Sequence, residues 1–204
     1  DSDGDGMPDW WEVQYGLDPF NGDIYPASAW WPLNEGSGSV VEDYSGNSNN
    51  GTISNLFVWT AGVSSNALQL DGTNSFVQFN DSDSLRLYYG GVSLWIQPSQ
   101  IYTNGSAVFF SKKKVSASCG YELAYTNGRL SFLVFSTGCK AVSLPYTFNQ
   151  TNWYHLVGMY GGDQSSLYVD GVLVKQTNWD WGTGQPGGIQ QTNTNPRIGA
   201  TSDA

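Results

Sequence analysis

The start of the chain combines carboxylates with a spacing that suits a calcium ion. Acidic residues occupy the positions where a calcium-binding loop places its side-chain ligands: Asp1, Asp3, Asp5, Asp9 and Glu12. Gly6 permits the sharp turn that such a loop needs, and the backbone carbonyl of Met7 can supply a further oxygen. Residues 1–12 therefore predict one Ca²⁺ site. The alternative is an acidic tail without fixed structure.

A short helix is expected directly after this loop. Pro8 suits the first turn of a helix, Gly16 favours its end, and Pro19 prevents its continuation. The string DSDGDGMPDWWEVQYGLDP resembles the thrombospondin type 3-like calcium repeats of bacterial extracellular proteins. The resemblance implies a calcium-stiffened spacer over residues 1–24, followed by a second domain over residues 25–204.

A second group of oxygen side chains follows in residues 43–51, where Asp43 is surrounded by Ser, Asn and turn-forming Gly. We expect Asp71 to approach this loop in the fold, and hard oxygen ligands at irregular spacing suit a second Ca²⁺. The alternative is a loop whose side chains bond to their own backbone. The residues leave both interpretations open.

Two tryptophans, Trp179 and Trp181, open a loop rich in Gly, Gln, Asn and Thr. Flat aromatic faces beside amide side chains suit sugar rings, because stacking is combined with hydrogen bonds to hydroxyls. We therefore predict a ligand-binding role for this pair. The alternative is that the indoles pack against the protein itself.

Cys119 and Cys139 flank a predicted hairpin that turns at Asn127-Gly128. Their positions place them near one another across its open end, so a disulfide is expected in an oxidising compartment. The alternative is two unpaired thiols.

Charge narrows the possible partners. The formal net charge is −10, and only eight residues are Lys or Arg. Nucleic acid is excluded as a partner, because neutralising phosphates needs clustered cations. The one basic run, Lys112-Lys113-Lys114, is expected to be a solvated loop between strands. No apolar run is long enough for a transmembrane segment, so we expect no membrane insertion.

The body of the chain alternates short β-branched and aromatic runs with turn residues, which predicts an all-β antiparallel sandwich. The predicted strands cover residues 28–31, 67–70, 76–79, 92–96, 107–111, 120–125, 129–135, 154–160, 166–169, 172–175 and 197–198. The ordered strings AWWPLNEGSG, EDYSGNSNNGTI, ALQLDGTNSFVQF, VSLWIQP, WYHLVGMY and LYVDGVLV resemble the laminin-G-like, concanavalin A-like jelly roll. In that family a further strand follows the segment RIGA, so we expect an open sheet edge at the C-terminus.

Catalysis is not expected. Glu122 has no carboxylate two residues away on its own strand, and no Ser/His/Asp set can be built around the single histidine, His155. We therefore expect a calcium-binding, secreted or cell-surface module of bacterial type that binds glycan or another surface polymer. The alternative is a structural repeat of an adhesin or extracellular filament, in which identical subunits join end to end and complete each other's sheets.

Overall fold

The structure is a computed structural model that describes residues 2, 20, 27–100, 105–114, 116, 119–136, 138–179 and 187–202. The predicted calcium loop and the helix after it lie outside these residues except for Ser2, and so does Trp181. Both predictions therefore stay predictions. Within the described ranges no helix is long and apolar enough to cross a membrane.

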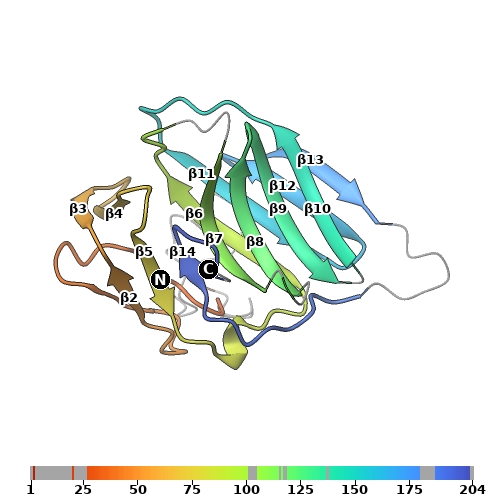
Figure 1. Cartoon of the computed structure of the whole chain (residues 1–204), viewed down its shortest axis with the longest axis horizontal. Coiled ribbons are helices and arrows are strands. Elements are labelled where there is room, and N and C mark those ends of the chain that lie inside the picture. Colours follow the sequence, from red (N-terminus) through yellow and green to blue (C-terminus); the bar gives the residue numbers. More distant parts are fainter. Residues whose placement is uncertain are drawn as a thin grey trace.

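The described chain forms antiparallel sheets, which confirms the all-β sandwich (Figure 1). One sheet has the strand order β1-β2-β5-β14-β7-β8-β9-β10, a second has the order β13-β12-β11-β6, and β3 pairs with β4 in a third. The strands are β1 Val40–Val41, β2 Gly51–Ser54, β3 Phe57–Ala61, β4 Asn66–Leu70, β5 Phe76–Phe79, β6 Gly90–Ile96, β7 Ser106–Lys114, β8 Cys119–Thr126, β9 Arg129–Ser136, β10 Gly138–Pro145, β11 Tyr154–Tyr160, β12 Gln164–Val169, β13 Val172–Asn178 and β14 Arg197–Ile198.

Two predicted hairpin turns are confirmed. Asn127 and Gly128 have φ of 50° and 74°, and Asp170 and Gly171 have φ of 50° and 77°. A two-residue turn with positive φ at both positions matches the twist of the flanking strands, and Asn, Asp and Gly adopt it most readily. The turns fix the register of β8 with β9 and of β12 with β13.

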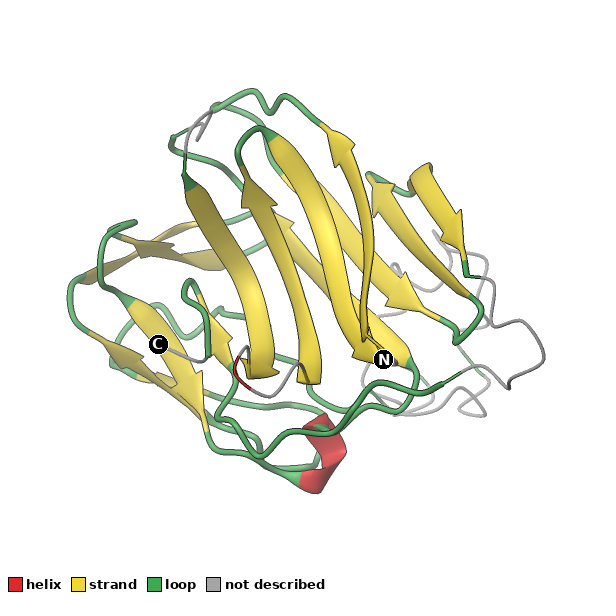
Figure 2. Ribbon diagram, turned by 45° about the vertical axis from the view of Figure 1, so that its right-hand side comes forward, coloured by secondary structure: helices red, strands yellow, loops and turns green. Residues whose placement is uncertain are grey.

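Alternation along the strands builds the core between the two larger sheets (Figure 2). On β8 and β9 one set of alternate residues is buried in the main hydrophobic cluster, and it includes Tyr121, Leu123, Leu130, Phe132 and Val134. A smaller cluster lies beside it under β1, β2 and β5. A 3-10 turn, η1 at Asp83–Leu85, lies between β5 and β6 and is drawn in red in Figure 2.

The first predicted strand, residues 28–31, is not a strand. Single hydrogen bonds rather than a strand ladder hold this segment: Trp30 N–H donates to Asp43 Oδ1 at 2.9 Å, the Tyr44 N–H donates to the carbonyl of Trp30 at 2.8 Å, and the Trp31 indole N–H donates to the carbonyl of Asn49 at 2.8 Å. The aromatic pattern therefore reported burial correctly but not backbone pairing.

The segment RIGA lies inside the large sheet, and the further strand expected after it, with the open edge that its absence would leave, stays a prediction. The short strand β14 lies between β5 and β7 and pairs with both, through Arg197↔Gln78 and Arg197↔Ser111 (Figure 1). The segment RIGA therefore fills the middle of the large sheet, where its backbone groups have partners on either side.

The predicted disulfide between Cys119 and Cys139 is wrong, because both cysteines are free. Residue 138 begins a new strand, β10, so that β9 separates the two thiols. Gly120 pairs with Phe135, and Phe135 pairs with Cys139, so these three share one face of the sheet. Cys119, one residue from Gly120, points to the other face and is buried, whereas Cys139 is exposed. A distance of two strand spacings, about 10 Å, is too long for a disulfide.

The expectation of a solvated lysine loop is wrong as well. Lys112, Lys113 and Lys114 form the end of β7, and alternation sends their side chains to different faces. Lys112 is 1% exposed on the core side, and Lys113 forms an ion pair with Glu122 on the other face.

Candidate functional site

The loop after β4 is shaped by a single carboxylate. Asp71 accepts backbone N–H groups from Thr73, Asn74 and Ser75 at 2.9–3.1 Å, and hydroxyl groups from Thr73 and Ser75 at 2.8 and 2.7 Å. These hydrogen bonds, led by that from the Thr73 N–H, hold the pKa of Asp71 well below its usual range. The charged carboxylate therefore organises residues 71–75 into one fixed loop.

This loop borders a cavity of about 400 Å³, which we call the Phe76 hollow. The residues that line it include Asn55, Thr73, Asn74, Ser75, Phe76 and Arg197. The Arg197 guanidinium lies 4.4 Å from the centre of the Phe76 ring and donates to Gln78 Oε1 at 3.1–3.2 Å. The hollow thus combines an aromatic ring, a planar cation, amides and hydroxyls on a braced support.

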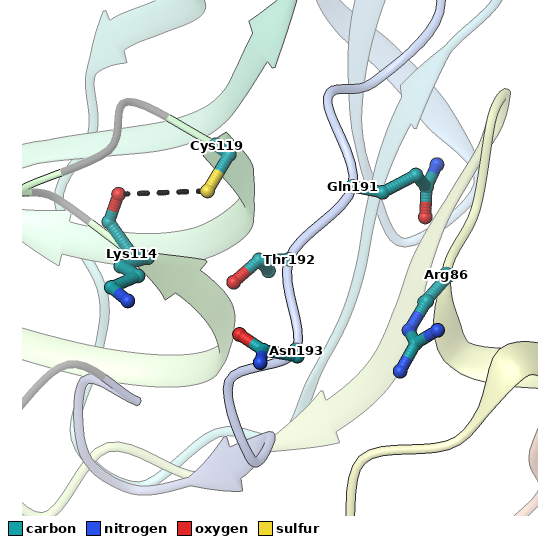
Figure 3. A pocket seen from close by; sticks show the side chains of 6 residues that line it. All are labelled: Arg86, Lys114, Cys119, Gln191, Thr192 and Asn193. Atoms are coloured by element: carbon teal, nitrogen blue, oxygen red, sulfur yellow. Dashed lines mark hydrogen bonds between the residues drawn. The ribbon is translucent and has the colours of Figure 1, made fainter.

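A second cavity, of about 530 Å³, lies where the C-terminal end of β7 meets the segment before β14. We call it the Lys114 hollow, and it is lined by Arg86, Lys114, Cys119, Gln191, Thr192 and Asn193. Figure 3 shows residues 191–193 passing between the two cations, with Thr192 and Asn193 turned toward Lys114 and Gln191 turned toward Arg86. The Cys119 thiol donates to the carbonyl of Lys114 at 3.9 Å. The lining is polar and cationic.

A buried ion network supports the Lys114 hollow from behind. Asp81 pairs with both Arg86 and Lys112, and the Lys112 ammonium also donates to the carbonyl of Thr194 at 3.0 Å. Burial alone would raise the pKa of Asp81, but the two cations hold that pKa below its usual value. Burial likewise lowers the pKa of Lys112, against the opposing pull of Asp81. The network ties η1, β7 and the segment before β14 to one point.

The structure does not bring the two predicted ligands of the second Ca²⁺ site together. Asp43 accepts N–H groups from Trp30, Ser45 and Asn49, and its N–H donates to Asn50 at the start of β2. The Asp71 loop instead lies beside Asn55, just past the other end of β2. Each carboxylate satisfies its own loop, as the alternative interpretation expected. Among the described residues, no His, Cys, Asp and Glu side chains gather in a group of three that could hold a metal.

Trp179, the described member of the tryptophan pair, packs against the main core and is half-buried. Its indole N–H donates to Ser165 Oγ at 3.0 Å, and the Lys140 ammonium lies 5.2 Å from the ring centre. The position of Trp181 falls outside the described residues. The ligand-binding role of the pair stays a prediction.

Glu122 lies on β8. The neighbours of Glu122 in register are Ser111 and Leu133, and its carboxylate pairs with Lys113 at 2.5 Å. His155 is buried, stacks on Trp95, and has its Nε2 atom 2.8 Å from Ser93 Oγ. Burial lowers the pKa of His155, which favours its neutral form.

Sequence reasoning missed both hollows. The string Asp71-Gly72-Thr73-Asn74-Ser75 carries a local signal, since an Asp followed by small polar residues commonly forms such a side-chain-to-backbone turn. Nothing in the sequence joins Lys114 to Arg86, or Phe76 to Arg197, because each pair is assembled from segments far apart in the chain.

Comparison with known proteins identifies relatives by family and by fold. A family model described as the concanavalin A-like lectin/glucanases superfamily matches residues 71–204, more than half of the chain. Among curated proteins, none matches the chain.

Solved structures with the same fold include binding domains. One is domain 4 of AbnA, a GH43 extracellular arabinanase from Geobacillus stearothermophilus, in complex with arabinotriose. It matches with a TM-score of 0.57 and 20% identity, and the match covers 78% of this chain and 85% of that domain. The binding domain of botulinum neurotoxin DC matches with 11% identity and a TM-score of 0.58, in complex with SialylT or with rat synaptotagmin II. Each match covers 84% of this chain, but only 45% and 46% of the two neurotoxin chains, so this chain spans under half of their length.

Proposed function

Because the chain belongs to the concanavalin A-like lectin/glucanase superfamily, we propose that it is a non-catalytic, extracellular carbohydrate-binding module. One structure of the same fold holds arabinotriose, and another was solved with SialylT. The first of these is a domain of an extracellular bacterial enzyme, which supports a secreted or cell-surface setting for this chain.

We assign the glycan contact to the Phe76 hollow, and one observation carries the assignment. Residues with an aromatic ring, a braced guanidinium and amide side chains line one cavity beside a loop that Asp71 holds in place. A sugar ring offers apolar C–H faces and hydroxyl edges, which such a set can stack on and hydrogen-bond. Pre-formed loops lose little entropy on binding, which favours affinity for a small ligand.

A glycan array that includes arabino-oligosaccharides and sialylated glycans tests the proposal, followed by calorimetry on the best ligand. Phe76→Leu keeps an apolar side chain but removes the flat ring, so affinity should fall about fivefold, the equivalent of about 1 kcal/mol. Asn74→Ala should also weaken binding, whereas Asn193→Ala, a matched change in the other hollow, should not. Full affinity in both Phe76→Leu and Asn74→Ala would show that the glycan does not bind at this hollow.

The tryptophan pair is the rival location for the same function. The hydrogen bond of Trp179 to Ser165 and its packing against the core favour a structural role for that indole. Trp181→Ala decides the matter for the second indole: loss of binding to the array ligand would place the site there. The filament alternative needs a sheet edge left open by the strand expected after RIGA. The described strand β14 is itself paired on both sides, and we do not extend the proposal to end-to-end assembly.

A further inference from the structure

The Lys114 hollow stands out by its charge. The chain carries a formal net charge of −10 and has only eight Lys and Arg residues. Two of these cations line the hollow, and a third, Lys112, lies buried in the network behind it. Three of the eight cations of the chain therefore gather at one point, where they raise the local potential for an anion.

Among the described residues, Lys114 is the cation of this hollow that no carboxylate neutralises. Arg86 pairs with Asp81 and Asp83, and Lys112 pairs with Asp81. The ammonium of Lys114 has no ion pair or hydrogen bond within the described part of the chain. Three cations and two carboxylates leave a net charge of one positive unit at the hollow. This balance suits a ligand group that carries a single negative charge.

The remaining lining groups are neutral and able to hydrogen-bond. The side-chain amide nitrogen of Gln191 donates to the carbonyls of Leu87 and Ile189 at 2.8 and 3.0 Å, and its side-chain oxygen remains an acceptor. The Asn193 side chain forms no hydrogen bond within the described residues, so it can both donate and accept. An acceptor oxygen cannot form a hydrogen bond with an anion that carries no hydrogen, but it can accept one from a sugar hydroxyl group.

We propose that the Lys114 hollow is a second saccharide site, and that it takes a carboxylate-bearing sugar such as a uronic acid. The carboxylate accepts from the Lys114 ammonium, and the sugar hydroxyls bond to the Asn193 amide, which is turned toward Lys114 (Figure 3). The cavity volume of about 530 Å³ lies in the range of ordinary small-ligand sites, roughly 300–1,000 Å³. For the saccharide part of the ligand this inference rests on the proposed function, but it concerns a different site.

The ion network holds the segments around the site in place. Asp81 and Lys112 fix Arg86 on one side, and the bond from Lys112 to Thr194 anchors the segment that carries Asn193 on the other. Backbone segments that are already in place lose little freedom when a ligand arrives, so the ligand has to order only the Lys114 and Asn193 side chains. The same network keeps the Arg86 guanidinium engaged, so Lys114 is the cation available to a ligand.

Calorimetric titration with trigalacturonate and with its methyl ester tests the proposal, because the two probes differ only in charge. We expect the acid to bind at least tenfold more tightly than the ester at low salt. Lys114→Gln should weaken binding of the acid roughly tenfold, as for loss of a charge-assisted hydrogen bond. It should leave the ester unchanged. Lys175→Gln, on an exposed position of β13, is the matched control and should bind like the original protein.

Three results would overturn the inference. Equal binding of acid and ester would show that the carboxylate is not recognised. Full affinity in Lys114→Gln would show that the ligand does not bind at the Lys114 hollow. Inorganic phosphate that competes as well as trigalacturonate would show a plain anion site without sugar recognition. If neutral glycans still bind through the Phe76 hollow in any of these cases, the proposed function stands and this inference alone fails. If no saccharide binds at all, the proposed function fails first.

Discussion

The Phe76 hollow and the Lys114 hollow are held in shape by different means. At the Phe76 hollow one exposed carboxylate, Asp71, collects its donors from residues within four positions of itself. At the Lys114 hollow Asp81 and Lys112 are 31 residues apart, and Lys112 and Thr194 are 82 apart. The first hollow is a local structure set on the fold, whereas the second is part of what holds the fold together.

This difference predicts different consequences of damage. An exposed hydrogen-bonded loop can open without disturbing the sandwich, because solvent replaces the lost bonds. A buried ion network cannot, because the surviving charge is left without water or a partner. Each hollow should therefore fail in its own way when its central carboxylate is removed.

The largest effect is expected at Asp81. Asp81→Ala leaves the Lys112 ammonium, which is 1% exposed, without its counter-ion. The free energy of unfolding should fall by about 3–5 kcal/mol, measured by urea denaturation. The matched control is Asp83→Ala, whose 94%-exposed side chain pairs with the same Arg86, and this change should cost at most about 0.5 kcal/mol.

A double variant sharpens this first prediction. Combining Asp81→Leu with Lys112→Met removes both charges and fills the space with apolar atoms, so it should recover most of the lost stability. If Asp81→Ala unfolds at the same urea concentration as the original protein, the buried network is not a stabilising element and the contrast between the hollows is wrong.

The next effect is expected at Asp71 and should appear in binding rather than in stability. Asp71→Ala removes the acceptor that fixes residues 71–75, so the array ligand should bind roughly tenfold more weakly, while trigalacturonate should bind the other hollow as before. Amide hydrogen exchange should show faster exchange at Thr73–Ser75 and little change in β8 and β9. A global loss of stability in this variant would contradict a purely local role.

Low pH should change the stability of the protein less than the substitutions above do. Both Asp71 and Asp81 have pKa values below the ordinary value of about 3.9, so the stabilisation they give is complete above about pH 4. It is lost as the pH falls below that value and each group is protonated in the folded state. Unfolding stability should therefore drop below pH 4 in the original protein and drop less in Asp81→Ala. Carboxyl chemical shifts would show whether Asp71 titrates later than an ordinary Asp. Parallel acid curves for the two proteins would contradict the assignment to Asp81.

The same contrast explains how much of the molecule the sequence predicts. Period-two alternation and the dipeptides Asn127-Gly128 and Asp170-Gly171 are local signals, and they gave the correct sandwich and two correct hairpins. The errors fall where long-range pairing decides. The strand Arg197–Ile198 was predicted, but nothing in its sequence shows that it lies between β5 and β7. Cys139 looks like the end of a hairpin, but it begins the next strand.

The candidate sites follow the same division. The sequence indicated that Asp43 and Asp71 lie in polar loops, and each carboxylate does bond within its own loop. Their predicted approach to one another failed, because β2 separates the two loops. Lys112 was placed in solvent because a run of three lysines is usually exposed. Strand alternation instead sent its side chain inward to meet Asp81, and one basic run of sequence carries no sign of that partner.

The smallest effect on the two hollows is expected from the calcium segment. The spacing of acids in residues 1–12 predicts Ca²⁺ binding, and Asp5→Ala removes one central carboxylate from that set. Calorimetry should therefore lose one Ca²⁺-binding event. Both saccharide affinities should remain within about twofold, because neither hollow draws a lining residue from this segment. If the number of bound Ca²⁺ ions is unchanged, the segment is not a calcium site. If Ca²⁺ binding is lost together with affinity at one hollow, the segment also supports that hollow, and the comparison must include it as a third element.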